Sequence, residues 1–427
     1  MKNFVKKKGV LALCLFGLAL VACGGEQDTE YHTTYGDPHQ EGYYEYVGQE
    51  VEDYVDFENH FVADVDYLIY ILENNFPLFN ATQRVLDIDL HKLLEEVRES
   101  AYRGEISYLN VSLFNALRNF DLGYANFGLL ETLSAANVQF HVNHRQRNQW
   151  TEVLDNPTTL DFYFSNPRAF ELNPAGTGIG GAFPTEILEE GRIALVTIPA
   201  VLNNFLIDHH TEELLAFAKT IVDYEHLIID MTHVSGWEMG WFQQVIIQNL
   251  ISQPVAYSHN FFSMGGEHTR QFYSMLPHGE AGFVPVTDEL LAQFPHLHPD
   301  DVGLLHYHYY MQGTINPSDR SVGFDGKIWL LVSSNNIYAS DHAASLVQET
   351  GFATLVGEPT SGGGITSMFS VPLVLPNTGM VVRFMPLYGV DHLGRNTWEH
   401  PTQPDIFNRE GMDALQTVLA LIEEGDY

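Results

Sequence analysis

The chain has 427 residues, of which 45% are hydrophobic and 12% aromatic, so a mostly disordered or low-complexity protein is excluded. This length suits about two or three domains. Asp and Glu number 55 against 20 Lys and Arg, and the resulting formal charge of −35 disfavours binding to nucleic acid. Both cysteines, Cys14 and Cys23, lie near the N-terminus, which excludes a disulfide framework in the rest of the chain.

Residues 1–22 have the pattern of a signal peptide, because a lysine-rich start is followed by a short apolar run. The run ends in the letters LVACG at 20–24, which resemble a bacterial lipobox. Cleavage there would leave Cys23 as a lipidated N-terminus, although an ordinary signal peptide with an incidental cysteine is the alternative. The lipobox predicts an extracytoplasmic lipoprotein that is anchored to the bacterial cell membrane through Cys23.

The next segments differ in composition. Residues 23–60 are acidic and lack Lys and Arg after the cysteine, so we expect an extended tether, with a tyrosine-rich binding strip as the alternative. Apolar residues at helical spacing predict a helical N-terminal domain over 61–132, with helices near 62–72, 90–97 and 111–122. Residues 133–190 contain Asn-Pro pairs and a glycine cluster, and are expected to form an irregular connection.

From residue 191 to 427 the pattern alternates between strands and helices. Strands are expected at 193–198, 227–230, 328–332 and 353–356, and helices at 211–222, 242–251, 340–349 and 411–423. Two further runs, 368–374 and 380–385, predict a hairpin. Continuous apolar strands between helices favour an α/β fold whose sheet is covered on both faces, with an insertion at 253–325.

Two strand-to-helix junctions carry the candidate chemistry, because reactive groups of open α/β sheets gather where strands end. The first, 230–237, contains Gly236, and the second, 336–344, contains Ser340. A serine that opens a helix is usually an N-cap. A glycine N–H at the first junction could, however, pair with the N–H that follows Ser340 to form an oxyanion hole.

Over residues 62–410 the sequence resembles the tail-specific (C-terminal processing) serine peptidases of family S41, including their tricorn-like branch. Residues 227–236 resemble the strand that ends in an oxyanion glycine, here Gly236, and residues 332–344 resemble the nucleophile segment Thr-x-Ser-Ala-x-Glu. The resemblance places the nucleophile at Ser340, the second oxyanion N–H at Asp341 and a supporting carboxylate at Glu399. Residues 355–364 resemble the family's Leu-Val-Gly-Glu-x-Thr-x-Gly-x-Gly turn.

The resemblance implies a ClpP/crotonase-like sheet and hydrolysis of peptide bonds in peptide or protein substrates. The family's general base is missing, however. Gly363 stands where some members have lysine, and Tyr124 occupies the position of the histidine of the tricorn-like branch. His233 and His400 are the candidates for a replacement base. A catalytically weakened or inactive pseudo-peptidase that binds a peptide or small ligand is therefore the alternative function, and a surface adhesion or scaffold lipoprotein is a third.

Other partners are not expected. The His-x-His pairs at 296–298 and 306–308 arise readily by chance in a chain with 20 histidines, so no metal or other cofactor is predicted. Residues 133–190 are too short for the PDZ domain that many S41 peptidases carry and lack its carboxylate-binding loop, so no PDZ domain is predicted either.

Overall fold

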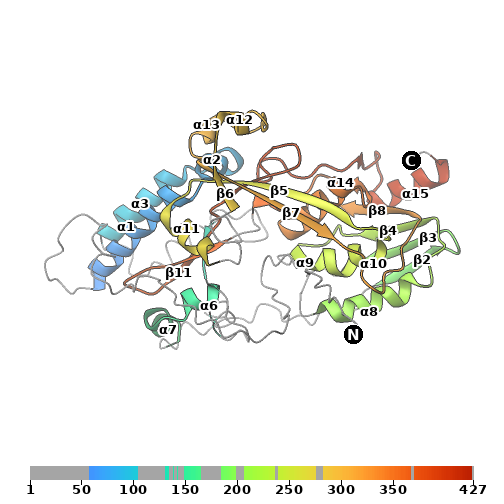
Figure 1. Cartoon of the computed structure of the whole chain (residues 1–427), viewed down its shortest axis with the longest axis horizontal. Coiled ribbons are helices and arrows are strands. Elements are labelled where there is room, and N and C mark those ends of the chain that lie inside the picture. Colours follow the sequence, from blue (N-terminus) through green and yellow to red (C-terminus); the bar gives the residue numbers. More distant parts are fainter. Residues whose placement is uncertain are drawn as a thin grey trace, which may run out of the picture.

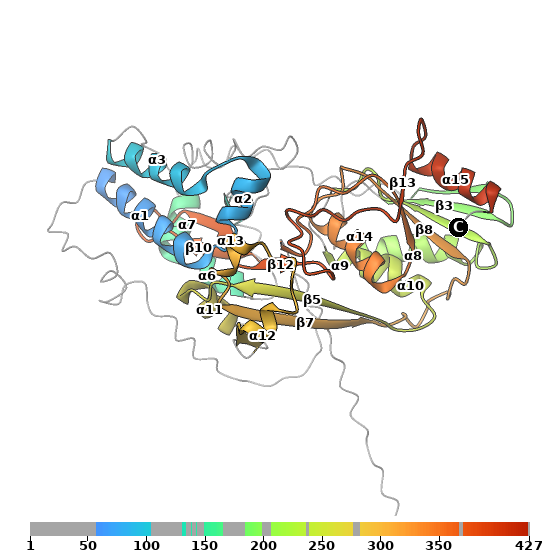
Figure 2. The same cartoon turned by 90° about the horizontal axis from the view of Figure 1, so that it is seen from above.

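The computed structural model describes residues 57–103, 130–133, 138, 142, 149–164, 184–198, 206–235, 239–275, 282–366 and 370–425. These residues form an elongated molecule with N-terminal helices at one end and a large sheet at the other (Figures 1 and 2). Within the described part, no helix has the length and apolar character needed to cross a membrane.

The N-terminal end consists of α1 (Phe57–Asn75), α2 (Phe79–Leu86) and α3 (Leu90–Tyr102). Asp89 caps α3 by accepting a hydrogen bond from the backbone of Lys92. The apolar faces of these helices are buried, which confirms the small helical region. The expected helix at 111–122 lies outside the described residues.

The central sheet has six strands, and all neighbours are parallel except the edge pair β2–β3. In spatial order the strands are β13 (Ile406–Phe407), β9 (Thr354–Gly357), β8 (Lys327–Val332), β4 (His226–Asp230), β3 (Ile193–Thr197) and β2 (Thr185–Glu189). Alternate side chains of the four inner strands, β9, β8, β4 and β3, enter two separate hydrophobic clusters. The sheet is therefore buried on both faces, as its continuous apolar strands predicted.

Four helical segments cover this sheet, and they lie between or after its strands. They are α8 (Ile207–Ala218), α9 (Met239–Trp241) with its continuation through the π-helical turn η3 (Phe242–Ile247) into α10 (Gln248–Leu250), α14 (Ala339–Thr350) and α15 (Ala414–Glu424). Residues of α8, η3 and α14 share one cluster, whereas α15 packs on the opposite face. Helix α8 begins four residues before the expected start at 211, because its first turn lacks the apolar spacing that marks the rest.

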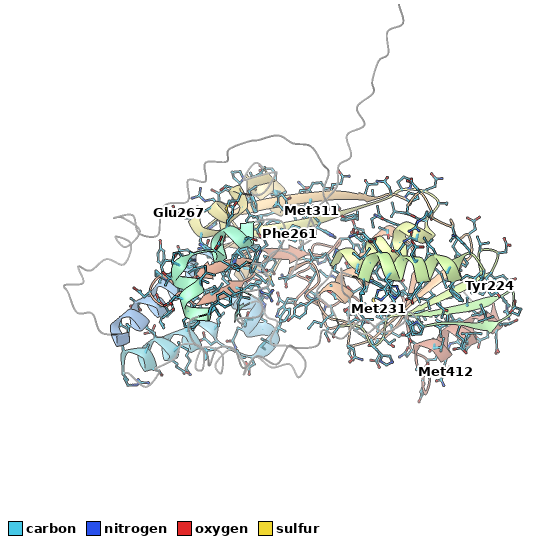
Figure 3. The ribbon with its side chains drawn as sticks, turned by 90° about the horizontal axis from the view of Figure 1, so that it is seen from below. Tyr224, Met231, Phe261, Glu267, Met311 and Met412 are labelled. Carbon is cyan, nitrogen blue, oxygen red and sulfur yellow. The ribbon has the colours of Figure 1, made fainter. Side chains whose placement is uncertain are left out.

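A four-stranded antiparallel sheet connects the two ends of the molecule (Figure 1). It contains β12 (Tyr388–Val390), the long strands β5 (Val255–Ser263) and β7 (Tyr307–Ile315), and the short edge strand β6 (Phe283–Pro285). Three short helices accompany these strands: α11 (Glu267–Ser274), α12 (Asp288–Leu291) and α13 (Pro299–Val302). Figure 3 shows Phe261 and Met311 on the two long strands, between Glu267 at one end and Met231 at the other.

A third, three-stranded sheet packs near the N-terminal helices. It pairs β1 (Leu130–Thr132) and β10 (Val371–Val374) with β11 (Val381–Phe384), and the β10–β11 hairpin agrees with the expectation from sequence. The 133–190 segment is more regular than expected, since it contains α6 (Gln149–Leu154), α7 (Pro157–Phe164) and strand β2. Strand β2 was missed because its side chains are mostly exposed and it lacks an apolar run.

Candidate active site

The two strand-to-helix junctions meet at one edge of the central sheet. Strands β4 and β8 are parallel neighbours, so their carboxyl ends lie side by side. The amide of Asn336, which is fully buried, donates to the carbonyl oxygens of Met231 at 2.6 Å and Val234 at 2.9 Å. Ser333 adds a hydroxyl hydrogen bond to the carbonyl oxygen of Thr232 at 2.6 Å. The first junction is therefore fixed against the second up to residue 235, while Gly236 lies outside the described residues.

The glycine-rich turn after β9 joins the same edge. The backbone N–H of Tyr338 donates to Gly362 O at 3.0 Å, and that of Ser361 donates to Asn336 O at 2.7 Å. The N–H of Gly363 reaches Thr397 O at 2.9 Å. These bonds connect the turn at 358–364 both to the start of α14 and to the segment that carries Glu399.

Asp341 is the centre of this turn's hydrogen bonding. Its buried carboxylate accepts from the Thr360 hydroxyl at 2.6 Å and from the backbone N–H groups of Gly364 at 2.8 Å and Thr402 at 3.2 Å. Burial raises the pKa of Asp341, and these hydrogen bonds oppose part of that rise. The side chain thus holds the glycine-rich turn against α14. Its backbone N–H, which we expected to serve an oxyanion, lies in the first turn of that helix.

Ser340 lies in the first turn of α14 and is fully buried. Its hydroxyl donates to the carbonyl oxygen of Ile337 at 2.9 Å, within the same turn. The described residues bring Ser340 to the expected edge of the sheet, but the hydroxyl is bonded to the chain's own backbone.

The residue that caps α14 is Tyr338, and its backbone is unusual. Its φ of 57° and ψ of −115° are rarely adopted by a residue other than glycine. The sequence contains a signal for this position. When Asn336 is aligned with the first letter of Thr-x-Ser-Ala-x-Glu without a gap, the glutamate falls on Asp341 and the serine on Tyr338, two positions before Ser340.

Glu399 takes part in an ion-pair cluster rather than in a hydrogen bond with Ser340. Arg84 of α2 donates to both of its carboxylate oxygens, at 2.5 and 2.9 Å, and also pairs with Asp301. The Tyr388 hydroxyl donates to the same carboxylate at 3.4 Å. Burial opposes the charge of Arg84, but the two carboxylates raise its pKa overall. Burial and the same two carboxylates raise the pKa of Tyr388. Sequence analysis missed Arg84 because nothing local marks a partner so distant along the chain.

Among the described residues, no histidine lies in hydrogen-bond contact with Ser340. His342 and His259 face each other with their Nε2 atoms 3.0 Å apart in the core, and burial lowers the pKa of His342 to about 4. His233 and His400 are exposed, and no hydrogen bond connects either of them to Ser340 in the described part. The position of Tyr124 lies outside it.

The described side chains provide no group of three or more His, Cys, Asp or Glu residues that could hold a metal ion. Three of the four histidines of the two His-x-His pairs, all but His296, have hydrogen-bond contacts to other groups. For example, His308 pairs with the side chain of Asn260 at 2.9 Å, and both ring nitrogens of His306 contact backbone carbonyls.

Comparison with known proteins identifies the class of this fold and site. The model of peptidase family S41 matches residues 192–407, a span that contains β3, β4, β8, β9, β13 and both junctions. The chain therefore belongs to peptidase family S41, whose members are serine peptidases that act on proteins or peptides. No curated protein sequence matches the chain significantly.

Among solved structures, mature CPAF complexed with lactacystin is similar to this chain with a TM-score of 0.50 and 12% identity, over 87% of this chain and 100% of CPAF. A putative peptidase from Parabacteroides merdae gives a TM-score of 0.46 at 15% identity, covering 86% of this chain and 96% of the other. A lipoprotein from Streptococcus agalactiae gives 0.45 at 12% identity, covering 88% and 99%. At these identities the likeness concerns the fold.

Proposed function

We propose that this chain takes peptide or protein segments at the carboxyl edge of its central sheet, outside the cytoplasm and anchored to a membrane. The observation that carries the proposal is membership in peptidase family S41 over the span that builds this edge. Three hydrogen-bonded turns converge there. Convergent backbone and polar groups where parallel strands end are typical of ligand sites in α/β proteins.

The first candidate for the chemistry is hydrolysis of peptide bonds through Ser340, which family membership supports. In this reaction the hydroxyl would attack the substrate carbonyl, and the N–H groups of Gly236 and Asp341 would stabilise the oxyanion. Glu399 would support the site. The reaction requires the Ser340 hydroxyl to leave Ile337 O and to find a proton acceptor.

The second candidate is binding of a peptide without hydrolysis, and a specific observation favours it. The Ser340 hydroxyl is fully buried and already donates to the backbone of its own turn. Gly363 replaces the lysine of other members, and no described histidine bonds to Ser340. Because general-base assistance typically contributes about 10²–10⁴-fold, a serine in this state reacts slowly at best.

Fluorescein-labelled casein and a fluorophosphonate probe together test the proposal. Casein should bind, as measured by fluorescence anisotropy. Labelling of the wild type that disappears in Ser340→Ala supports hydrolysis, whereas binding without labelling supports the second candidate. Labelling gained only in Tyr124→His would show that the proton acceptor alone had been lost. If casein does not bind and the probe does not label the protein, the proposal is contradicted and a scaffold or adhesion protein is favoured.

The membrane anchor is tested separately. If Cys23 is lipidated, the wild type expressed in bacteria partitions into the detergent phase of Triton X-114, because acyl chains add buried methylene groups. Cys23→Ala should move to the aqueous phase. Cys14→Ala is the matched control, since Cys14 lies within the expected signal peptide and its loss should leave partitioning unchanged.

A further inference from the structure

Tyr338 is held in a backbone conformation that a tyrosine does not adopt without compensation. Among the described residues other than glycine, only Asp87 and Tyr338 have a positive φ. Asp87 is in the ordinary left-handed helical region, which Asp tolerates. Tyr338, at φ 57° and ψ −115°, is in a region populated mainly by glycine, where any other residue is strained. The surroundings must therefore impose this conformation.

The contacts on both sides of Tyr338 account for it. Its N–H donates to Gly362 O, and its own carbonyl accepts from the N–H of His342 at 2.8 Å. Tyr338 is therefore bonded to the glycine-rich turn on one side and to the first turn of α14 on the other. Its buried ring stacks on Trp398, with ring centroids 6.2 Å apart. A Cβ atom added to Gly363 would lie 3.1 Å from the Trp398 ring and 3.2 Å from that of Tyr338. The glycine at 363 thus allows the two rings to approach each other.

A sharp, strained turn between a strand and a helix is the arrangement by which α/β enzymes present a nucleophile at the end of a sheet. In this chain Tyr338 occupies that turn. Ser340 lies two residues further along α14, about 200° around the helix axis, and its hydroxyl is directed to Ile337 O. The side chains of Tyr338 and Ser340 therefore point in different directions and cannot both contact the same bound group.

We propose that the residue at position 338, and not the residue at 340, contacts a bound peptide at the end of the sheet. In this chain the contact is made by the stacked rings of Tyr338 and Trp398. The inference rests on the proposed function that peptides bind at this edge. Position 338 holds a phenol ring and not a serine hydroxyl, so it offers a bound peptide a contact surface.

Trp398 offers a group that such a peptide could use. The side chain is buried, and its indole Nε1 has no hydrogen-bond partner among the described residues. A buried N–H donor without a partner destabilises the folded protein. The carbonyl oxygen of a peptide backbone would satisfy it, so the ligand class is an extended peptide segment that accepts a hydrogen bond beside the two rings.

Cysteine substitution tests which position is presented. In the full-length chain with Cys14→Ser and Cys23→Ser, no other thiol is present. Tyr338→Cys and Ser340→Cys are then compared for their rate of alkylation by iodoacetamide, with the urea-unfolded proteins as the reference. We expect the thiol at 338 to react at least tenfold faster than the thiol at 340 in the folded protein. A thiol at 340 that reacts as fast or faster, or a thiol at 338 that does not react, overturns the inference.

The urea midpoints of two further variants test the strained turn even if Tyr338→Cys folds poorly. Tyr338→Gly and Tyr338→Ala both remove the ring, but only alanine retains the strain of a positive φ. The glycine variant should therefore have the higher urea midpoint, whereas at Ala339, inside α14, glycine should lower it. A Tyr338→Ala variant as stable as Tyr338→Gly contradicts the strained turn.

Protection by casein separates this inference from the proposed function. Faster alkylation at 338 that saturating casein does not slow supports the presenting turn but contradicts peptide binding there. Casein cleavage that survives in Tyr338→Phe and is lost in Ser340→Ala upholds a peptide-directed function and overturns the role of position 338.

Discussion

Two imidazoles meet in the core where α14 packs on β5. His259 and His342 share one hydrogen bond between their Nε2 atoms, which is possible only while at least one ring is neutral. Burial lowers the pKa of both rings, and the positive charge of His342 would lower that of His259 further. The pair is therefore a stabilising contact at neutral pH that acid removes.

The pair predicts the sign of the pH dependence of stability. Unfolded histidines titrate near pH 6.5 and the folded His342 near pH 4, so in between the unfolded chain binds more protons. The free energy of unfolding should fall as the pH drops from about 6.5 to about 4. Each such histidine contributes up to about 1.4 kcal/mol per pH unit.

Urea unfolding at pH values between 4 and 7 provides the measurement. His342→Gln should reduce the slope of the unfolding free energy against pH by up to about 1.4 kcal/mol per pH unit, the contribution of one proton. The exposed His233→Gln should leave that slope unchanged. A wild-type slope retained in His342→Gln would mean that the pair is not the titrating group.

At the scale of elements, α1 is attached to the β10–β11 hairpin through one carboxylate. Asp64 is fully buried and accepts from the backbone N–H groups of Asn377 at 2.9 Å and Thr378 at 2.7 Å, and from the Asn377 amide at 3.0 Å. Burial raises the pKa of Asp64, and these donors oppose the rise. The three accepted hydrogen bonds offset the cost of burying the carboxylate, and they hold the hairpin turn against α1.

Asp64→Asn should therefore loosen the hairpin without removing α1. An amide nitrogen would face an N–H donor, and an unsatisfied buried donor costs about 1–3 kcal/mol. Hydrogen exchange of the β10 and β11 amides should become faster than in the wild type. Glu73→Gln, at an exposed position of the same helix, is the control and should not change exchange. Equal exchange in both variants would contradict the role of Asp64.

Periodicity predicted the four inner strands of the central sheet, β3, β4, β8 and β9, because each of them is a mostly apolar run. Strands β4 and β8 and helix α14 lie close to their expected ranges for this reason. Strand β2 was not predicted because an exposed edge strand carries no such pattern. The long β5–β7 pair was expected only as an insertion, since its aromatic residues face neighbours that are distant in sequence.

The meeting of the two strand-to-helix junctions was predicted, but the details of their contacts were not. Two strand ends with polar turns were sufficient to select the edge of the sheet where Ser340 and Asp341 lie. The hydrogen bond from the Ser340 hydroxyl to its own turn depends on backbone geometry that residue types do not encode. The strained turn at Tyr338 likewise depends on Gly362 and Gly363, which approach it from another strand.

For the whole molecule, Arg84 connects three parts that are far apart in sequence. It pairs with Asp301 in α13 and with Glu399 after β12, while belonging itself to α2. The side chains of Asp301 and Glu399 are 0% and 12% exposed, and that of Arg84 is 23% exposed. Attraction between buried charges is strong, but so is the cost of leaving one of them alone.

Removing the cation of this cluster should therefore destabilise the folded protein. Arg84→Met leaves Asp301 as a buried charge without its cation, so the free energy of unfolding should fall by about 3–5 kcal/mol. Arg98→Met is the matched control, because that arginine is 40% exposed in its ion pair with Asp66 and such pairs contribute about 0–1 kcal/mol. In Arg84→Met/Asp301→Asn the loss should be smaller than the sum of the two single losses, because the second change removes the stranded charge. If Arg84→Met costs no more than Arg98→Met in urea unfolding, the cluster does not hold the helical end to the sheet. The packing of α1 against α11 would then have to provide that attachment.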